Sequence, residues 1–476
     1  MIDTSVPVAV IDREGYEGVS IARTLGRMGV PMYLVGQEGF RTPGWSSRYW
    51  AGRVRWNFSL PEDEFLAFLL DFGSRIRANH GARAVLLTQK DWLAIFVERN
   101  SKSLQEQFVF PRPAQPIVRS LLNKWEMHLL AKEHGIPTAA TACPTSPKDA
   151  LDFLEFAGLP IVMKGADRYV EDQTPTTVIH SRQELMDELG RREAAGGSLN
   201  VVLQEYIPGD VDTVWMCNGY FPSIPDQAVI FTGKKLRQLS ATGIASIGIC
   251  LPNETVAIQT RRFMDGVGYR GCVGIGYRYD RRDALYKVLD VNPRVSGVFR
   301  LFVGTAGMDV VRACYLDLTG QQVPSTTLQP GRKWMSEDHY FYAENAGLRI
   351  DDLRIGEWIG LVRGIREFHW FAADDPLPIV MWLRKWFRWR GLDVVKRMRI
   401  SLVRTRQLQA STERETQVRQ ELDQVRTTEA ELRRMLDQTR SALDESEASL
   451  QALSETRAWR LIARWWKLKG LLTRHR

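Results

Sequence analysis

The sequence lacks the features that mark secreted scaffolds and membrane-spanning chains. Its five cysteines are scattered and form no C-x-x-C pair, which is typical of reduced core thiols in a cytosolic protein. No run of apolar residues approaches the roughly 18 that a membrane-spanning helix needs. The N-terminus has no basic segment before its short apolar run, so no signal peptide is predicted.

The signatures of several enzyme classes are missing too. The sequence has no G-x-S-x-G and no H-E-x-x-H, and its seven histidines do not cluster, which argues against serine hydrolases and zinc proteases. Gly15 and Gly18 follow the first predicted strand without completing G-x-G-x-x-G, so a dinucleotide-binding fingerprint is not supported.

The charge of the chain is concentrated in one part. The 476 residues carry a net charge of +8, but residues 381–476 carry +10 and residues 1–380 carry −2. A slightly acidic body fits an enzyme of small molecules, whereas the basic tail favours an anionic partner. A chain of this length predicts two to four domains at roughly 100–200 residues each.

The first 110 residues alternate short apolar runs with helical patterns. Strands are expected at Pro7–Ile11, Met32–Val35 and Ala84–Thr88, and helices at 19–28 and from Phe65 to about Ile76. This β-α-β-α-β order predicts a parallel sheet covered by helices, and hence an α/β domain.

Residues 111–330 continue the alternation of strands and helices and are expected to form a second domain, of the α+β class. Ser146 and Ser181 have the spacing of helix N-caps with an acidic residue three positions later. The strands expected here are Pro160–Lys164, Val201–Tyr206, Gln227–Thr232 and Tyr286–Val291. Residues 331–378 are rich in aromatics and are interpreted as a C-terminal extension of the globular body.

The C-terminal part has a helical composition. Proline and glycine are absent from Leu392 to Lys469, which allows one or two long helices. Within 411–456, leucine and valine repeat in one heptad register, with defects at Glu429, Thr439 and Ser446. This pattern predicts a coiled coil that joins copies of the chain into a homo-oligomer. The alternative is a single long helix that packs on its own body.

Two segments beside the predicted coiled coil interleave tryptophan with cations. They are a basic aromatic segment at 379–410 and a basic amphipathic tail at 457–476. Such segments favour reversible attachment to an anionic membrane surface. Packing of the tryptophans inside the protein is the second interpretation. Nucleic-acid binding comes last, since no nucleic-acid-binding motif accompanies the charge.

The most specific polar group lies at a predicted strand end. Alternation along the strand puts Asp290 and Asn292 on one face, while Leu289 and Val291 are expected to pack behind. A carboxylate and a carboxamide oxygen two residues apart can bind one Mg²⁺. Arg294 follows and could contact a phosphate or carboxylate. Taken alone, the same residues could simply cap a turn at the end of the strand.

Further polar residues end other predicted strands. Lys164 ends an apolar strand, where a lysine can reach a phosphate, although an edge lysine can equally extend into solvent. The segment Gln204, Glu205, Tyr206 and Ile207 runs into a turn that carries Asp210 and Asp212. Its backbone could pair with an adenine and one of its acids with a ribose; the alternative is a plain strand and turn.

Together these motifs resemble the ATP-grasp superfamily, in particular the carboxylate–amine ligase group that includes D-aspartate ligase-like proteins. The resemblance covers about residues 1–330. It implies a pre-ATP-grasp α/β domain followed by an ATP-grasp domain. The roles that it implies are as follows: Lys124 and Lys164 on the nucleotide phosphates, Gln204, Glu205, Tyr206 and Ile207 at the adenine, Asp210 or Asp212 at the ribose, Lys235 and Arg237 with Arg294 at the γ-phosphate and acyl substrate, and Asp290 and Asn292 on the metal.

One position departs from the family pattern. An acidic metal ligand usually precedes an aromatic on the strand before Asp290, and Gly276 stands there. If the two strands pair around the turn at 282–284, Gly276 lies opposite Asp290. Asp280 has the same strand parity but lies about 13 Å away at roughly 3.3 Å per residue, too far to replace it directly. Three alternatives follow: one Mg²⁺ suffices, another residue supplies the missing ligand, or catalysis is impaired.

The resemblance implies an ATP-dependent carboxylate–amine ligase that uses Mg²⁺, or Mn²⁺ in its place. A carboxylate would be activated as an acyl phosphate and then attacked by an amine, which needs no protein nucleophile. The enzyme is expected in the cytoplasm, with its tail on the inner face of the membrane. The alternative is an ATP-binding scaffold or pseudo-enzyme, with an impaired metal site, that acts through its coiled coil and membrane contacts.

Overall fold

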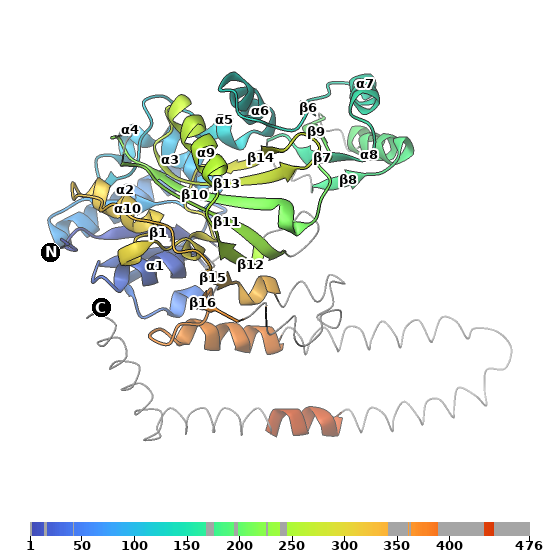
Figure 1. The fold of residues 1–476 in the computed structure, drawn as a ribbon. Helices are drawn as coiled ribbons and strands as arrows, with labels where there is room; N and C mark the ends of the chain where they lie inside the picture. The colour runs from blue at the N-terminus through green and yellow to red at the C-terminus, as the bar shows by residue number, and fades with distance from the viewer. Residues whose placement is uncertain are drawn as a thin grey trace, which may run out of the picture. The chain divides into compact units, whose positions relative to one another are not determined.

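The computed structural model divides the chain into two compact units, Met1–Trp386 and Phe387–Arg476. We call the first unit the body. The structure describes residues 2–13, 17–40, 42–167, 176–194, 199–224, 227–238, 245–340, 360, 363–388 and 433–441 (Figure 1).

The N-terminal sheet has five parallel strands in the order β3-β2-β1-β4-β5. The strands are β1 (Val8–Asp12), β2 (Met32–Gln37), β3 (Trp50–Trp56), β4 (Ala84–Leu87) and β5 (Phe108–Val109). They are connected by the helices α1 (Gly18–Gly26), α2 (Glu62–His80), α3 (Asp91–Arg99) and α4 (Ser101–Leu104) and by the 3-10 turn η1 (Pro43–Ser46). The predicted parallel α/β arrangement of this region is confirmed.

Helices cover both faces of this sheet, and β1 shows why. Val8 and Val10 pack into the cluster that contains residues of α1, whereas Ala9 and Ile11 pack with residues of α2 and α3. Alternate side chains of a strand point to opposite faces, so a strand covered on both sides must be apolar throughout. The continuous apolar run in the sequence follows from this position.

A small antiparallel sheet follows, with the order β6-β9-β7-β8. Its strands are β6 (Thr141–Ala142), β7 (Ile161–Gly165), β8 (Thr177–Ile179) and β9 (Val201–Glu205), and its helices are α7 (Pro147–Ala157) and α8 (Arg182–Ala194). Ser146 and Asp149 form the expected capping box at the start of α7. Figure 1 shows this lobe at one end of the large sheet and the N-terminal sheet at the other end.

The large sheet has seven strands in the order β14-β13-β10-β11-β12-β15-β16. They are β10 (Val214–Phe221), β11 (Val229–Gln238), β12 (Ala245–Cys250), β13 (Gly271–Asp280), β14 (Leu285–Asn292), β15 (Lys333–Met335) and β16 (Ile365–Phe368). Neighbouring strands are antiparallel except β15 and β16. The remaining elements are α5 (Val118–Leu122), α6 (Lys124–Glu133), η2 (Val211–Thr213), α9 (Glu254–Gly266), η4 (Phe299–Leu301), η5 (Thr305–Gly307) and α10 (Val310–Leu318).

The pairing of β13 with β14 confirms one expectation and corrects another. Gly276 lies opposite Asp290, as predicted, but the next pair is Tyr277 with Val288. The strand therefore has one extra residue, Leu289, at a β-bulge. Leu289 lines the cleft beside Asp290, so the prediction that it packs behind the strand was wrong. A bulge shifts the alternation of side chains by one residue.

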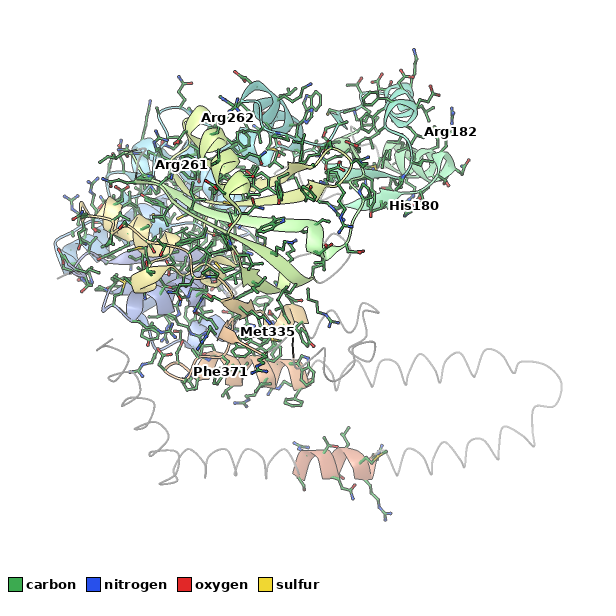
Figure 2. All side chains as sticks on the ribbon, in the orientation of Figure 1. His180, Arg182, Arg261, Arg262, Met335 and Phe371 are labelled. Atoms are coloured by element: carbon green, nitrogen blue, oxygen red, sulfur yellow. The ribbon has the colours of Figure 1, made fainter. Side chains whose placement is uncertain are left out.

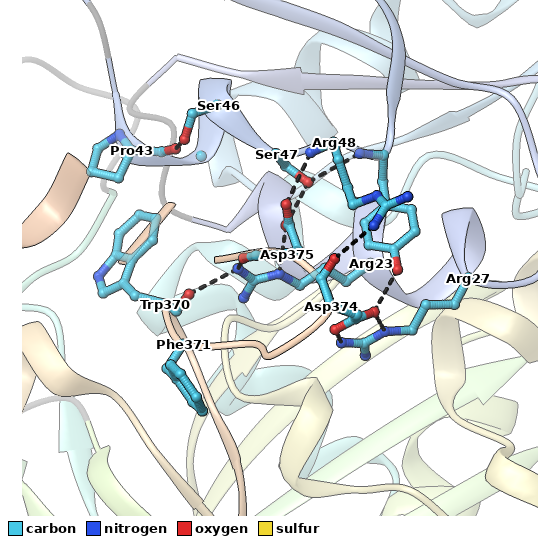
Figure 3. Close-up of polar contacts among 12 residues, drawn as sticks. Arg23, Arg27, Pro43, Ser46, Ser47, Arg48, Trp370, Phe371, Asp374 and Asp375 are labelled. Atoms are coloured by element: carbon cyan, nitrogen blue, oxygen red, sulfur yellow. Dashed lines mark hydrogen bonds and ion pairs between the residues drawn. The ribbon is translucent and has the colours of Figure 1, made fainter. Parts of the chain in front are cut away.

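The last part of the body connects the large sheet to the N-terminal sheet. Figure 3 shows Asp374 and Asp375, which follow β16, in contact with residues of α1 and of the segment around η1. Asp375 pairs with Arg23 at 2.9 Å and accepts a hydrogen bond from the hydroxyl of Ser47 at 2.7 Å. Arg23 also donates to the carbonyl oxygens of His369 and Trp370. This polar contact fixes the extension against α1.

A helix at residues 377–388 covers α1. Trp382 is buried with Val19 and Trp370, and Trp386 packs partly against the same cluster. The tryptophans at the start of the basic aromatic segment thus pack inside the protein, which was the second interpretation of that segment. The rest of the segment, 389–410, lies outside the described residues.

In the second unit the structure describes residues 387–388 and the helical segment 433–441, where Met435 and Leu436 are exposed. The remainder of the predicted coiled coil and the tail at 457–476 lie outside the described residues. Among the helices that the structure describes, none has the length and apolar character to cross a membrane.

Candidate active site

A cleft of about 980 Å³ lies between the small and large sheets. Residues of β7 and β9 line one side, and residues of β10, β11, β13 and β14 line the other. His180, which follows β8, lies on the lobe of the small sheet next to Arg182 and also lines the cleft (Figure 2). Loops after the N-terminal strands complete the wall through Glu17 and Lys90.

Lys164 and Gln204 meet on the small-sheet side of the cleft. The strands β7 and β9 are antiparallel neighbours, and the Lys164 ammonium donates to Gln204 Oε1 at 2.7 Å. Gln204 is buried, and its Nε2 donates to Thr141 Oγ1 at 3.2 Å. The hydrogen bond to this neutral partner thus holds the Lys164 ammonium at the cleft.

The segment after β9 forms the next part of the wall. Glu205, Tyr206, Ile207 and Asp210 all line the cleft. Glu205 receives hydrogen bonds from the Ala140 amide and from Arg282, so its carboxylate joins the small sheet to the large one.

Asp212 has a different environment from Asp210. It pairs with Arg281 at 3.0 Å, and more than half of its side chain is exposed. It is not among the residues that line the cleft. Of the two acids predicted near a ribose, the structure therefore brings only Asp210 to the cleft.

Asp290, Asn292 and Lys124 form a cluster on the large-sheet side. Asn292 Nδ2 donates to Asp290 Oδ2 at 2.9 Å, and the Lys124 ammonium pairs with Asp290 Oδ1. Lys124 is the first residue of α6, whose N-cap is the side chain of Asn123. Lys124 is buried, so its side chain is held at the end of β14, although the two segments are far apart in the sequence.

Arg294 lies next to this cluster. Its Nε donates to Asp91 at 2.5 Å and its guanidinium contacts Asn292 Oδ1 at 3.2 Å. Burial lowers the pKa of Arg294, but the nearby Asp91 and Glu17 outweigh it and hold that pKa above the ordinary value. Arg294 is therefore a permanent cation at the cleft.

Lys235 and Arg237 were predicted together, but the structure separates them. Lys235 lines the cleft, and burial, with the charge of Arg278, lowers its pKa to about 8. Arg237 lies over the ring of Tyr340, 5.1 Å from its centre, and is not among the residues that line the cleft. The predicted small-residue loop at 241–243 lies outside the described residues.

Several residues of the cleft were missed from the sequence. Glu17 pairs with Lys90 at 3.7 Å, and both residues line the cleft, while Asp91 holds Arg294. Glu17 precedes α1 and Lys90 precedes α3, so both follow strands of the parallel sheet. Ligands bind at the carboxyl ends of such strands, and this rule could have identified the two residues.

Asn218 was missed as well. It lies on β10, is almost fully buried and lines the cleft, and its Oδ1 accepts no hydrogen bond. A buried amide oxygen without a donor loses hydration without compensation, which makes Asn218 a candidate contact for a bound molecule.

Asp290 and Asn292 fit one hard cation. Together they present one carboxylate and one carboxamide, and Mg²⁺ is commonly held by one or two carboxylates with phosphates and waters. Over the described part of the chain, no group of three or more His, Cys, Asp and Glu residues could hold a metal. The residues thus suit a metal that arrives with a phosphate ligand and do not form a complete protein cage.

Solved structures share this arrangement of sheets and helices. An L-amino acid ligase from Bacillus licheniformis aligns over 67% of this chain and 75% of its own, with a TM-score of 0.50 and 15% identity. A carboxyaminoimidazole ribonucleotide synthase from Aspergillus clavatus, solved with ATP, aligns over 70% of this chain and 81% of its own, with a TM-score of 0.53 and 12% identity. The body has the ATP-grasp fold.

A curated relative supports the same assignment at the level of sequence. The chain is 24% identical to a D-aspartate ligase from Enterococcus faecium over 262 residues. The match covers 52% of this chain and 62% of the ligase, so this chain spans less than two thirds of that relative. No family model matches the chain. The resemblance to the ATP-grasp carboxylate–amine ligase group is confirmed.

Proposed function

We propose that the ATP-grasp cleft binds ATP and uses it to join a carboxylate to an amine. One observation carries this proposal: six lysine and arginine side chains and the Asp290–Asn292 pair converge on one cleft of about 980 Å³. The cations are Lys90, Lys124, Lys164, Lys235, Arg278 and Arg294. A cleft with this charge suits a polyphosphate. The D-aspartate ligase and L-amino acid ligase among the similar proteins support the same chemistry.

The proposed nucleotide lies along the cleft with its base at the segment after β9. Tyr206 and the buried Ile207 provide an apolar surface, and backbone groups of this segment can pair with the adenine edge. Asp210 is the acid proposed for the ribose. Lys164, on the neighbouring strand β7, contributes a point charge to the phosphates.

The phosphate end lies at the large sheet. We propose that Asp290 and Asn292 hold Mg²⁺, or Mn²⁺ in its place. When bound, the metal would neutralise phosphate charge. Lys124, Lys235 and Arg294 orient the γ-phosphate and the substrate carboxylate by their charges. Arg237 would act in this cleft only if its side chain left the ring of Tyr340.

The proposed reaction has two steps. A carboxylate oxygen attacks the γ-phosphorus of ATP, the bond to the bridging oxygen of ADP breaks, and an acyl phosphate remains. The amine nitrogen then attacks the acyl carbon, phosphate leaves, and the nitrogen loses a proton. Neither step requires a protein nucleophile. The cations supply positioning and charge neutralisation.

Variants of the cleft test the proposal. Lys164→Ala and Asp290→Ala should each abolish carboxylate-dependent ADP release while circular dichroism shows that the fold is retained. Lys132→Ala, an exposed lysine on α6, is the control and should leave the rate unchanged. Wild-type rates in either cleft variant would refute the site assignment.

An ATP-binding scaffold is the second candidate, and the observation that favours it is Gly276 beside Asp290. A scaffold would bind ATP without carboxylate-dependent turnover. If ATP binds and no mixture of acid and amine stimulates ADP release, the scaffold is the better assignment.

We also propose a cytoplasmic location in which the helix at 377–388 contacts an anionic membrane surface. Its inner face holds Trp382, whereas Leu377, Val380 and Leu383 form an exposed row. Exposed cations flank this row at Arg384 and Lys385, and residues 381–410 carry a net +8 in the sequence.

Vesicle sedimentation tests the membrane contact. The full chain should sediment with phosphatidylserine-containing vesicles and detach in high salt. Val380→Asp should weaken this, whereas Ile258→Asp, at an exposed isoleucine of α9, should not. Equal recovery with neutral vesicles in high salt would contradict the proposed contact.

A homo-oligomer through a coiled coil at 411–456 completes the proposal. Leu436, a seam position of the heptad register, is exposed in the described helix at 433–441, as are the other residues of that segment. Sedimentation equilibrium should give an oligomer for the wild type and a monomer for Leu436→Lys combined with Leu443→Lys. A monomeric wild type would refute the coiled coil.

A further inference from the structure

The surroundings of Asp290 limit how many cations the cleft can hold. Asp290 lies on β14, and its neighbour across β13 is Gly276, which has no side chain to offer. The next strand, β10, places Met216 beside Gly276. Met216 lines the cleft, but a thioether is a soft donor that Mg²⁺ does not select. Asp290 is therefore the only carboxylate among these three neighbouring positions.

The other acids that line the cleft are Glu17, Glu205 and Asp210. Glu17 pairs with Lys90, and Glu205 pairs with Arg282 at 2.6 Å. Asp210 lies in the turn after β9 and is the acid proposed for the ribose. Asp280, further along β13, does not line the cleft, is fully buried and pairs with Lys287 at 2.7 Å.

A lysine of the protein also contacts one oxygen of the Asp290 carboxylate. The Lys124 ammonium contacts Oδ1, and Asn292 Nδ2 contacts Oδ2. Lys124 is buried at the start of α6, and its backbone amide donates to Ala166 at 2.8 Å, so its position is fixed. One carboxylate beside one ammonium carries no net charge, which disfavours a second divalent cation at this position.

We infer that the cleft binds its nucleotide with a single divalent cation, held by Asp290 and Asn292, and that Gly276 is the residue that sets this number. The inference rests on the proposed binding of ATP. Lys124 then supplies, as a permanent part of the protein, positive charge that a further metal ion would bring. Gly276 is then also a position at which a substitution can add a carboxylate.

The backbone at Gly276 accepts a side chain. A Cβ built there meets its nearest heavy atom, Asp290 Cβ, at 3.9 Å, which is ordinary van der Waals contact, and the residue does not have a positive φ. Gly274 differs, because a Cβ there would come within 3.0 Å of Ser296. Gly276→Glu is therefore the substitution that adds a carboxylate to the cluster without disturbing the sheet, and Gly276→Gln is its neutral match in size.

The experiment counts Mn²⁺ and nucleotide on the full chain in the same samples. The protein is equilibrated by dialysis with Mn²⁺ and a non-hydrolysable ATP analogue. Bound nucleotide is measured by absorbance, and bound Mn²⁺ by electron paramagnetic resonance after acid release. We expect one Mn²⁺ per bound nucleotide in the wild type and in Gly276→Gln, and two in Gly276→Glu.

Each result decides a different point. Two Mn²⁺ per nucleotide in the wild type would overturn the inference, whether or not the variants fold. A count of one in nucleotide-loaded Gly276→Glu would show that Gly276 does not set the number. Absence of bound nucleotide in the wild type would refute the proposed function itself, and the inference with it.

Discussion

Gly276 on β13 lies directly opposite Asp290 on β14, and both residues line the cleft between the small and large sheets. In the proposed metal site this pair supplies one carboxylate, assisted by Asn292 and opposed by the ammonium of Lys124. The predictions below test the cleft around this pair and the body that supports it.

Loss of Lys164 should weaken nucleotide binding. Its ammonium is held toward the cleft by Gln204 at 2.7 Å. A hydrogen bond to a charged group contributes about 1.5–3 kcal/mol, so Lys164→Ala should lower the affinity for an ATP analogue about 10- to 100-fold. Isothermal titration calorimetry measures this directly. Lys132→Ala should bind as the wild type does, and an unchanged affinity in Lys164→Ala would remove Lys164 from the site.

Nucleotide binding should depend on pH through Lys235. Burial, together with Arg278, lowers the pKa of Lys235 to about 8. Bound phosphates favour its charged form and so raise that pKa, which means that binding near pH 8 takes up a proton. As the pH rises above 8, affinity should therefore fall, by up to about tenfold per pH unit for one linked proton.

Lys235→Met supplies the control for this pH dependence. The variant should bind more weakly at pH 7, and its affinity should change less between pH 7 and pH 9. Calorimetry in buffers of different ionisation enthalpy should show the proton uptake in the wild type and not in the variant. Identical pH profiles would assign the titration to another group.

The contact between Arg23 and Asp375 should support the stability of the body. Their side chains are 3% and 1% exposed, and Arg23 also donates to three backbone carbonyls (Figure 3). Removing one partner leaves a buried charge without compensation, which costs about 3–5 kcal/mol. Asp375→Asn should lower the free energy of unfolding by this amount in urea titrations.

A neighbouring pair provides the comparison. Arg27 and Asp374 are 30% and 42% exposed, so solvent screens their attraction. Arg27→Ala should therefore cost no more than about 1 kcal/mol. Equal losses in Asp375→Asn and Arg27→Ala would show that burial does not govern the strength of this contact.

Much of the fold could be predicted from local patterns. The apolar run at Pro7–Ile11 indicates a strand covered on both faces, and the turn after Asp280 sets the register that brings Gly276 opposite Asp290. Both features depend on residues that are close together in the sequence. Leu289 shows the limit of prediction from local patterns. A single bulge turns its side chain to the other face of the strand, and no residue type at this position indicates a bulge.

The cleft could be predicted in part, for a similar reason. Lys164, Asp290 and Asn292 stand at ends of recognisable strands, and the structure brings them to one cleft. Asn218 lies in the interior of β10, and whether its side chain faces the cleft depends on how the sheets pack. Asp212 was predicted there beside Asp210, although the turn carries its side chain to Arg281 instead.

Trapping of an acyl phosphate tests the central claim most directly. The full chain is incubated with ATP, Mg²⁺ and hydroxylamine, together with each member of a panel of D- and L-amino acids. Hydroxylamine captures an acyl phosphate as a hydroxamate whatever the natural amine is. The account predicts hydroxamate and ADP in equal amounts with at least one carboxylate, and neither product in Asp290→Ala. Binding of ATP without ADP release or hydroxamate across the whole panel would contradict it.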